Sequence, residues 1–159
     1  MSKFNLRSVA LFLAFVGISF GVISCEKDKD DNDEMMYTLT GNANGTQEVP
    51  IRVTTSATGT ISGTYNKNTN IMQYTITWNG LSSAPSAMHF HGPADPGVAA
   101  GVKIGISGFT TAATGSISRS DTLKTEADET DLLQGRWYYN IHTPANPGGE
   151  IRGQIFPTR

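Results

Sequence analysis

The sequence predicts an all-β domain over residues 37–159, built as an antiparallel β-sandwich or a Greek-key-like barrel with one short helix. From Tyr37 onward Thr, Ser and Gly are abundant, and this composition favours strands joined by tight turns. Hydrophobic and polar residues alternate with a period of two, as they do in half-buried strands. Several short strand-like segments follow one another between turn residues, which is typical of sandwiches and barrels.

The strand expected over residues 71–78 has the clearest pattern. Its hydrophobic residues share one face, namely Met72, Tyr74, Ile76 and Trp78. Residues 66–70 predict a hairpin loop that joins it to a strand over residues 57–65. Further strands are expected over residues 37–41, 86–91, 102–107, 114–118, 136–143 and 150–156. Only residues 126–133 predict a helix, with Thr125 and Asp128 placed as a capping box.

The N-terminal segment predicts export. Lys3 and Arg7 precede an apolar run over residues 9–22, so residues 1–24 have the organisation of a secretory signal peptide. Residues 22–25 (Val-Ile-Ser-Cys) resemble the bacterial lipobox, with Val22 where Leu is commoner. Cys25 is the only cysteine and is therefore the expected site of lipidation. An ordinary secreted protein with an incidental cysteine is the alternative.

The residues after Cys25 predict a tether and a location. Residues 26–34 contain six acidic residues and two lysines, so residues 25–36 are expected to form a lipidated, acidic, flexible tether. This acidic run resembles the surface-export signals of Bacteroidetes lipoproteins. The sequence thus predicts an outer-membrane lipoprotein of the cell envelope, held to the membrane by its lipid and exposed at the surface. Two or three acyl chains make such an anchoring lasting.

The charge balance of the domain excludes one class of partner. Residues 37–159 carry eight acidic and eight basic residues and are therefore neutral. A nucleic-acid-binding domain needs a basic surface, so no nucleic-acid partner is expected. A protein or glycan partner is compatible with this composition.

Two loops repeat each other. Residues 91–97 (His-Gly-Pro-Ala-Asp-Pro-Gly) and residues 142–148 (His-Thr-Pro-Ala-Asn-Pro-Gly) are identical at five of seven positions. In both segments the prolines are expected to end strand pairing. We expect both loops to lie at one end of the fold and to present their histidines together. Convergent turn chemistry is the alternative explanation.

Three motifs give the chain a family resemblance. They are Thr46-Gln47-Glu48-Val49-Pro50, His89-Phe90-His91-Gly92-Pro93-Ala94, and the long closing motif over residues 139–154. Together they resemble the CHRD domain, the module first named from chordin, over about residues 37–157. Ile51 and Phe90 depart from the residues common at those positions. The resemblance implies a β fold and an extracellular location, and it implies little about activity.

The domain's only histidines, His89, His91 and His142, all lie in these motifs. Residues two apart on a strand point the same way, so His89 and His91 can converge on one ion, and His142 from a neighbouring strand can complete a three-histidine site for copper or zinc. Met88 and Phe90 alternate with the histidines, which places the histidines on the face away from the core. The alternative is that the imidazoles hydrogen-bond to loop backbone and stiffen the turns.

The acidic residues near these motifs have two interpretations. Glu150 can serve as a fourth ligand or can hold a ligand in place. Alternatively, Glu150 and Glu48 form structural ion pairs with Arg152 or Arg52.

Three functions are consistent with these observations. The first is a non-enzymatic surface lipoprotein whose domain binds a metal or a partner. The second is a copper- or zinc-dependent enzyme with a site like that of superoxide dismutase, and the third is a structural or adhesive envelope module without metal. No catalytic residue is predicted, because the sequence lacks a nucleophile elbow and a phosphate-binding loop.

Overall fold

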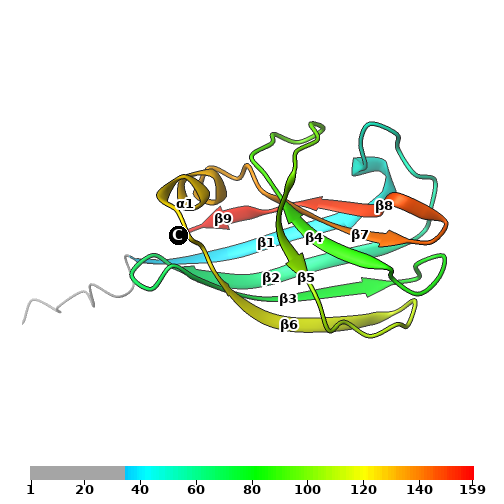
Figure 1. Ribbon diagram of the computed structural model, residues 1–159, viewed down its shortest axis with the longest axis horizontal. Coiled ribbons are helices and arrows are strands. Elements are labelled where there is room, and N and C mark those ends of the chain that lie inside the picture. Colours follow the sequence, from blue (N-terminus) through cyan, green and yellow to red (C-terminus); the bar gives the residue numbers. More distant parts are fainter. Residues whose placement is uncertain (1–34) are drawn as a thin grey trace, which may run out of the picture.

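The computed structural model describes residues 35–159 and arranges their nine strands in one antiparallel sheet (Figure 1). The strands are β1 (Met36–Asn44), β2 (Thr58–Asn66), β3 (Ile71–Asn79), β4 (Ala87–His91), β5 (Val102–Ile106), β6 (Gly115–Thr122), β7 (Tyr138–Thr143), β8 (Asn146–Gln154) and β9 (Phe156–Thr158). A short 3-10 helix, η2 (Gly45–Gln47), follows β1, and helix α1 (Glu126–Leu133) precedes β7. The sheet order is β5-β4-β7-β8-β1-β2-β3-β6, and β9 pairs with β1.

The sheet curls into a half-barrel, so that β4 and β5 lie across β2 and β3 (Figure 1). The inward-facing residues form the core, in which Trp78, Trp137 and Tyr139 are almost fully buried. The rings of Tyr74 on β3 and Phe90 on β4 are nearly perpendicular, with their centroids 4.8 Å apart. Curling therefore buries both halves of the sheet against each other without a separate second sheet.

The structure confirms the predicted class of fold and most of its elements. The expected face of β3 is buried, the helix has the expected bounds, and the predicted hairpin joins β2 to β3. Thr125 caps α1 by accepting a hydrogen bond from the backbone of Asp128, and its hydroxyl donates to the Asp128 carboxylate. Most strand boundaries differ from the predicted ones by a few residues, because pairing extends β1 and β6 beyond their hydrophobic patterns.

The interpretation of the repeated loops is wrong for the second one. Residues 92–101 do form a long loop between β4 and β5, but Asn146 and Pro147 already belong to β8, and only Pro144 and Ala145 form the turn. Because β4 and β7 are antiparallel, His91 pairs with Tyr138 at the start of β7. The two repeated segments therefore lie at opposite ends of this strand pair.

The remaining predictions about the N-terminal region lie outside the described residues. The predicted signal peptide, Cys25 and almost all of the tether belong to residues 1–34. Within residues 35–159, no helix has the length and hydrophobicity needed to cross a bilayer.

Candidate metal centre

The polar residues of β4, β7 and β8 point away from the core, as strand alternation requires. The pairing register places His89 beside Asn140, and Asn140 beside Arg152. On the core side of the same strands lie Met88, Phe90, Tyr139, Ile141 and Ile151, each at most 1% exposed. The prediction that the three histidines lie on the outward face is confirmed.

This outward face is not open to solvent everywhere, which differs from the expectation. His91 is only 8% exposed and Asn140 only 4%, whereas His89 and His142 are half-buried. The loop over residues 92–101 covers the face and is fixed by hydrogen bonds. Tyr138 Oη donates to the carbonyl of Ala100 at 3.2 Å and accepts from the Ala100 amide at 3.1 Å. An ion would reach the site from the side of His89 and His142.

The three histidines converge. One ring nitrogen from each lies within 4.8 Å of the others, and His89 Nδ1 is 3.0 Å from His142 Nε2. A tetrahedral ion with bonds of about 2.0–2.1 Å separates its ligands by about 3.3 Å, and the largest separation that two such bonds allow is about 4.1 Å. Side-chain movements of roughly 1 Å therefore bring all three nitrogens to bonding distance. His142 and His91 lie at opposite ends of the β4–β7 pair. His89 lies between them on the surface, so its ring connects the two.

Backbone carbonyls fix the tautomers of two of these rings. His91 Nδ1 lies 3.0 Å from the carbonyl of Ala100, and His142 Nδ1 lies 2.9 Å from the carbonyl of Pro147. A carbonyl only accepts, so each Nδ1 carries the proton and donates. In the neutral rings, both Nε2 atoms then present lone pairs. The imidazoles of His91 and His142 thus do hydrogen-bond to backbone carbonyls, and each ring keeps its Nε2 for a second contact.

A fourth acceptor faces the same point. Asn140 Oδ1 is 3.0 Å from Nε2 of His91 and 3.0 Å from Nε2 of His142. The amide nitrogen of Asn140 and the Glu48 carboxyl both lie beside Gly149, on the side away from this oxygen, and their interaction favours this orientation of the amide. Lone pairs that face one another at 3.0 Å repel unless a proton or a cation lies between them.

Burial favours the neutral form of two of the imidazoles, those of His89 and His142. Burial lowers the pKa of His89 below its ordinary value, and the neighbouring His142 and His91 lower it further. Burial also lowers the pKa of His142 and outweighs the opposite effect of the hydrogen bond to Pro147. Neutral imidazole is the form that binds metal ions.

The comparison with known protein families identifies the domain. The sequence model described as the CHRD domain matches residues 39–155. The chain belongs to the CHRD domain family. Neither the curated proteins nor the solved structures contain a significant match to the chain.

Glu150 of the CHRD domain is neither an ion-pair partner nor close to the three ring nitrogens. Its carboxylate is fully buried and accepts hydrogen bonds from the hydroxyls of Ser82 (2.6 Å), Thr143 (2.7 Å) and Thr55 (3.0 Å) and from the Ser82 amide (2.9 Å). Burial alone would raise the pKa of Glu150, but these hydrogen bonds outweigh burial and lower it. Glu150 therefore joins two loops to β8, which differs from both interpretations of this residue.

Glu48 and Arg152 of the CHRD domain are both buried, but no ion pair within 4.0 Å joins them among the described residues. Burial raises the pKa of Glu48 to about 7, against the charge of Arg152 and hydrogen bonds from the Val49 backbone and Asn140. The Arg152 guanidinium lies 3.5 Å from the centre of the Tyr138 ring. Tyr138 in turn stacks on His91, with ring centroids 4.7 Å apart and planes 2° apart.

The sequence analysis missed Asn140 and Tyr138. Both occupy the outward positions of β7, next to His142 in the same alternation, and the closing motif contains Asn140. The alternation of residues along β7 places both side chains on the outward face, but this pattern gives no indication that a loop buries them. Only the position of residues 92–101 makes them part of the site.

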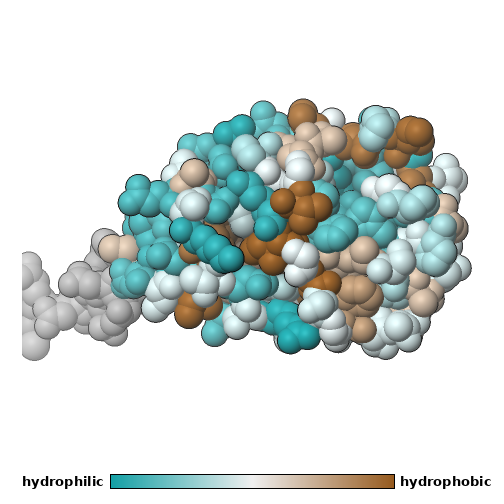
Figure 2. Space-filling view, viewed as in Figure 1, coloured by the Kyte–Doolittle hydropathy of each residue, from teal (hydrophilic) through white to brown (hydrophobic). Residues whose placement is uncertain are grey.

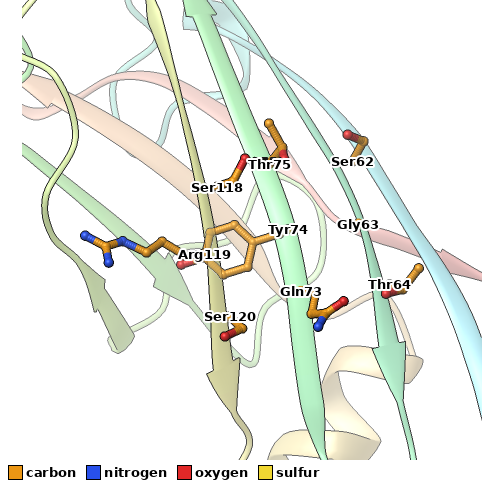
Figure 3. Close-up of a pocket in the computed structure, with 9 residues that line it drawn as sticks. All are labelled: Ser62, Gly63, Thr64, Gln73, Tyr74, Thr75, Ser118, Arg119 and Ser120. Carbon is orange, nitrogen blue, oxygen red and sulfur yellow. Dashed lines mark hydrogen bonds between the residues drawn. The ribbon is translucent and has the colours of Figure 1, made fainter.

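A second hollow of the CHRD domain lies elsewhere. It is shallow, has a volume of about 670 Å³ and lies on the outward face of β2, β3 and β6 (Figure 3). Small hydroxyl and amide side chains form most of its wall, including Ser62, Thr64, Gln73, Thr75 and Ser118. None of the predicted site residues lines it.

Proposed function

We propose that this CHRD domain binds one copper or zinc ion through His89, His91 and His142, within an exported protein that is anchored to the cell envelope by lipid on Cys25. The binding is non-catalytic in this proposal. Imidazole nitrogen suits both ions, and copper(II) is expected to bind more tightly than zinc.

One observation carries the proposal. The Nε2 atoms of His91 and His142 and Oδ1 of Asn140 face one point, and the carbonyls of Ala100 and Pro147 hold the ring protons on the far side of each imidazole. Metal-binding histidines commonly donate their other N–H to a backbone carbonyl, which orients the ring and fixes its tautomer. A cation at this point replaces the repulsion between lone pairs with attraction.

The geometry supports binding over catalysis. A catalytic zinc site keeps one coordination position open for water or substrate. Here Asn140 Oδ1 lies 3.0 Å from two of the three clustered histidine nitrogens, so protein atoms supply four potential ligands. Burial of His91 and Asn140 further limits access from that side.

Metal retention tests the proposal directly. The chain contains only three histidines, so a protein purified without a histidine tag has no other imidazole. In a Cys25→Ser background that removes the single thiol, protein loaded with copper or zinc and then desalted should retain about one ion per chain by elemental analysis. A His89→Ala/His91→Ala/His142→Ala variant should retain none.

The matched control for this variant is Thr75→Ala/Thr77→Ala/Ser118→Ala, which removes three polar side chains from the face of β3 and β6. It should retain metal like the parent protein, and circular dichroism should show that both variants are folded. Equal, low retention by the parent and the histidine variant would reject a metal site. Nitrogen-15 NMR of the metal-free protein should also show the proton of His91 and of His142 on Nδ1.

The anchoring part rests on the sequence around Cys25. A thiol is required for attachment of diacylglycerol, and several acyl chains give lasting membrane association. In a bacterium that processes lipoproteins, the protein should fractionate with membranes and incorporate labelled palmitate. The Cys25→Ser variant should do neither, and membrane association without Cys25 would contradict the proposal.

A further inference from the structure

A cleft separates two loops that rise on the same side of the domain, the loop after η2 and the loop between β4 and β5 (Figure 1). Residues of both loops line it, including Val49 and Arg52 from one and Pro96 from the other. Arg152 and Gln154 of β8 also line it. Its volume of about 290 Å³ is near the lower end for ligand pockets, so it suits a small molecule.

Arg152 is an unusual wall residue because it is charged and only 1% exposed. Its Nη2 donates to the carbonyl of Val98 at 2.8 Å, and its guanidinium plane covers Tyr138. Its Nη1 is buried and has no hydrogen-bond partner. Among residues 35–159, no carboxylate lies within ion-pair distance of this guanidinium. The buried Glu48 carboxyl interacts with the Arg152 charge only from beyond ion-pair distance. A buried cationic donor without a hydrogen-bond partner is costly, and an anion that reaches it would remove that cost.

The rest of the lining matches an anion that carries an aliphatic group. Arg52 adds a second positive charge, and no acidic residue lines the cleft. Val49 and Pro96 provide apolar contacts. The same two loops expose Ile51 (78%) and Val98 (52%), and hydrophobic surface appears on the projecting loops in Figure 2.

We propose that this cleft binds a small aliphatic carboxylate, with the guanidinium of Arg152, whose Nη1 lacks a hydrogen-bond partner, and the side chain of Arg52 as its charge partners. A guanidinium presents its N–H groups in a planar fork that matches a carboxylate. The apolar walls receive the aliphatic chain. Gln154 cannot be the donor in this arrangement, because its Nε2 already donates to the carbonyls of Ala94 and Gly135.

This site is separate from the histidine centre. Tyr138 lies between Arg152 and His91, so the carboxylate does not need the metal. Carboxylates also bind metal ions directly, and the experiment must exclude that route. It is therefore done with chelator-treated protein and repeated with the triple histidine variant, in which binding should persist even if the metal proposal fails.

The test uses hexanoate as the probe and hexanamide as its uncharged counterpart. Saturation-transfer NMR on the purified protein should show hexanoate bound at least about tenfold more tightly than hexanamide, because only the carboxylate satisfies the buried guanidinium. Inorganic phosphate should compete weakly, since it lacks the aliphatic group. Equal binding of hexanoate and hexanamide would overturn the proposal, and so would phosphate that binds as tightly as hexanoate.

Two substitutions locate the ligand. Arg52→Gln should weaken hexanoate binding about two- to fivefold without affecting the fold, because Arg52 is exposed. Lys124→Gln is the matched control, since it removes the same charge beside α1, at the other end of the domain, and should change nothing (Figure 1). Arg152→Lys keeps the charge, loses the fork and should weaken binding at least about tenfold if circular dichroism shows it is folded. Unchanged binding in Arg52→Gln would contradict the location.

Discussion

The outward face of the sheet has two halves. In both, side chains alternate between the core and the outside, but the outward residues of the two halves differ in size, charge and exposure. On β4, β7 and β8 the outward residues are large and ionisable or planar, such as His91, Tyr138 and Arg152, and loops bury them. On β2, β3 and β6 they are small and uncharged, such as Thr60, Thr77 and Ser118, and they are exposed. Figure 3 shows outward residues of the second kind, such as Ser62, Thr75 and Ser118, as short side chains on adjacent strands.

The difference shows what a covering loop requires of a polar face. Water satisfies exposed hydroxyls, and the hydroxyls of Thr60 and Thr77 also hydrogen-bond to each other at 2.6 Å. On the covered half, protein must replace that water, because an unpaired buried polar group costs about 1–3 kcal/mol. Specific partners therefore surround most covered side chains, and among the described residues only a few covered atoms, such as Nη1 of Arg152, lack a hydrogen-bond partner.

The largest effect expected from this comparison concerns Glu150. In Glu150→Ala, the donors of Ser82, Thr143 and Thr55 lose the buried carboxylate that is their common acceptor, and we expect the free energy of unfolding to fall by about 3–5 kcal/mol. Urea denaturation followed by tryptophan fluorescence measures this change.

The matched control for Glu150→Ala comes from the exposed half. Ser118→Ala removes only a surface hydroxyl that bonds to Thr75, so its effect should stay within about 0.5 kcal/mol. If both variants lose equally little stability, the buried hydrogen bonds of Glu150 do not stabilise the fold and the contrast between the halves fails.

A smaller effect is expected from pH. The pKa of Glu48 is about 7 in the folded domain and near 4.5 in the unfolded chain, so the folded state holds this proton over that range. The contribution of Glu48 to the free energy of unfolding should therefore be fully present below about pH 4.5. It should decrease as pH rises to about 7. The loss amounts to at most about 3 kcal/mol.

Urea midpoints at pH 5 and pH 8 check this contribution when the parent protein is compared with Glu48→Gln. The substitution keeps the shape and removes the charge, so the difference between the two midpoints should shrink. An unchanged pH dependence in Glu48→Gln would assign the effect to other groups.

Local pattern predicted much of this molecule. Alternation placed Trp78 in the core and the three histidines on the outward face, and Thr125 predicted the start of α1. Each of these follows from neighbours along the chain, because strand and helix geometry repeat within a few residues. The same local reasoning failed at Pro147, where the hairpin continued through a segment that its composition assigned to a loop.

The sequence by itself determined the β class of the domain, its family motifs and the face on which the histidines lie. Only the tertiary structure decided that residues 92–101 cover that face, that Asn140 joins the histidines, and that Glu150 bonds to Ser82 and not to an arginine. The reason is physical. These contacts join segments tens of residues apart, and they depend on how the curled sheet and its loops meet in space, which no periodic pattern along the chain encodes.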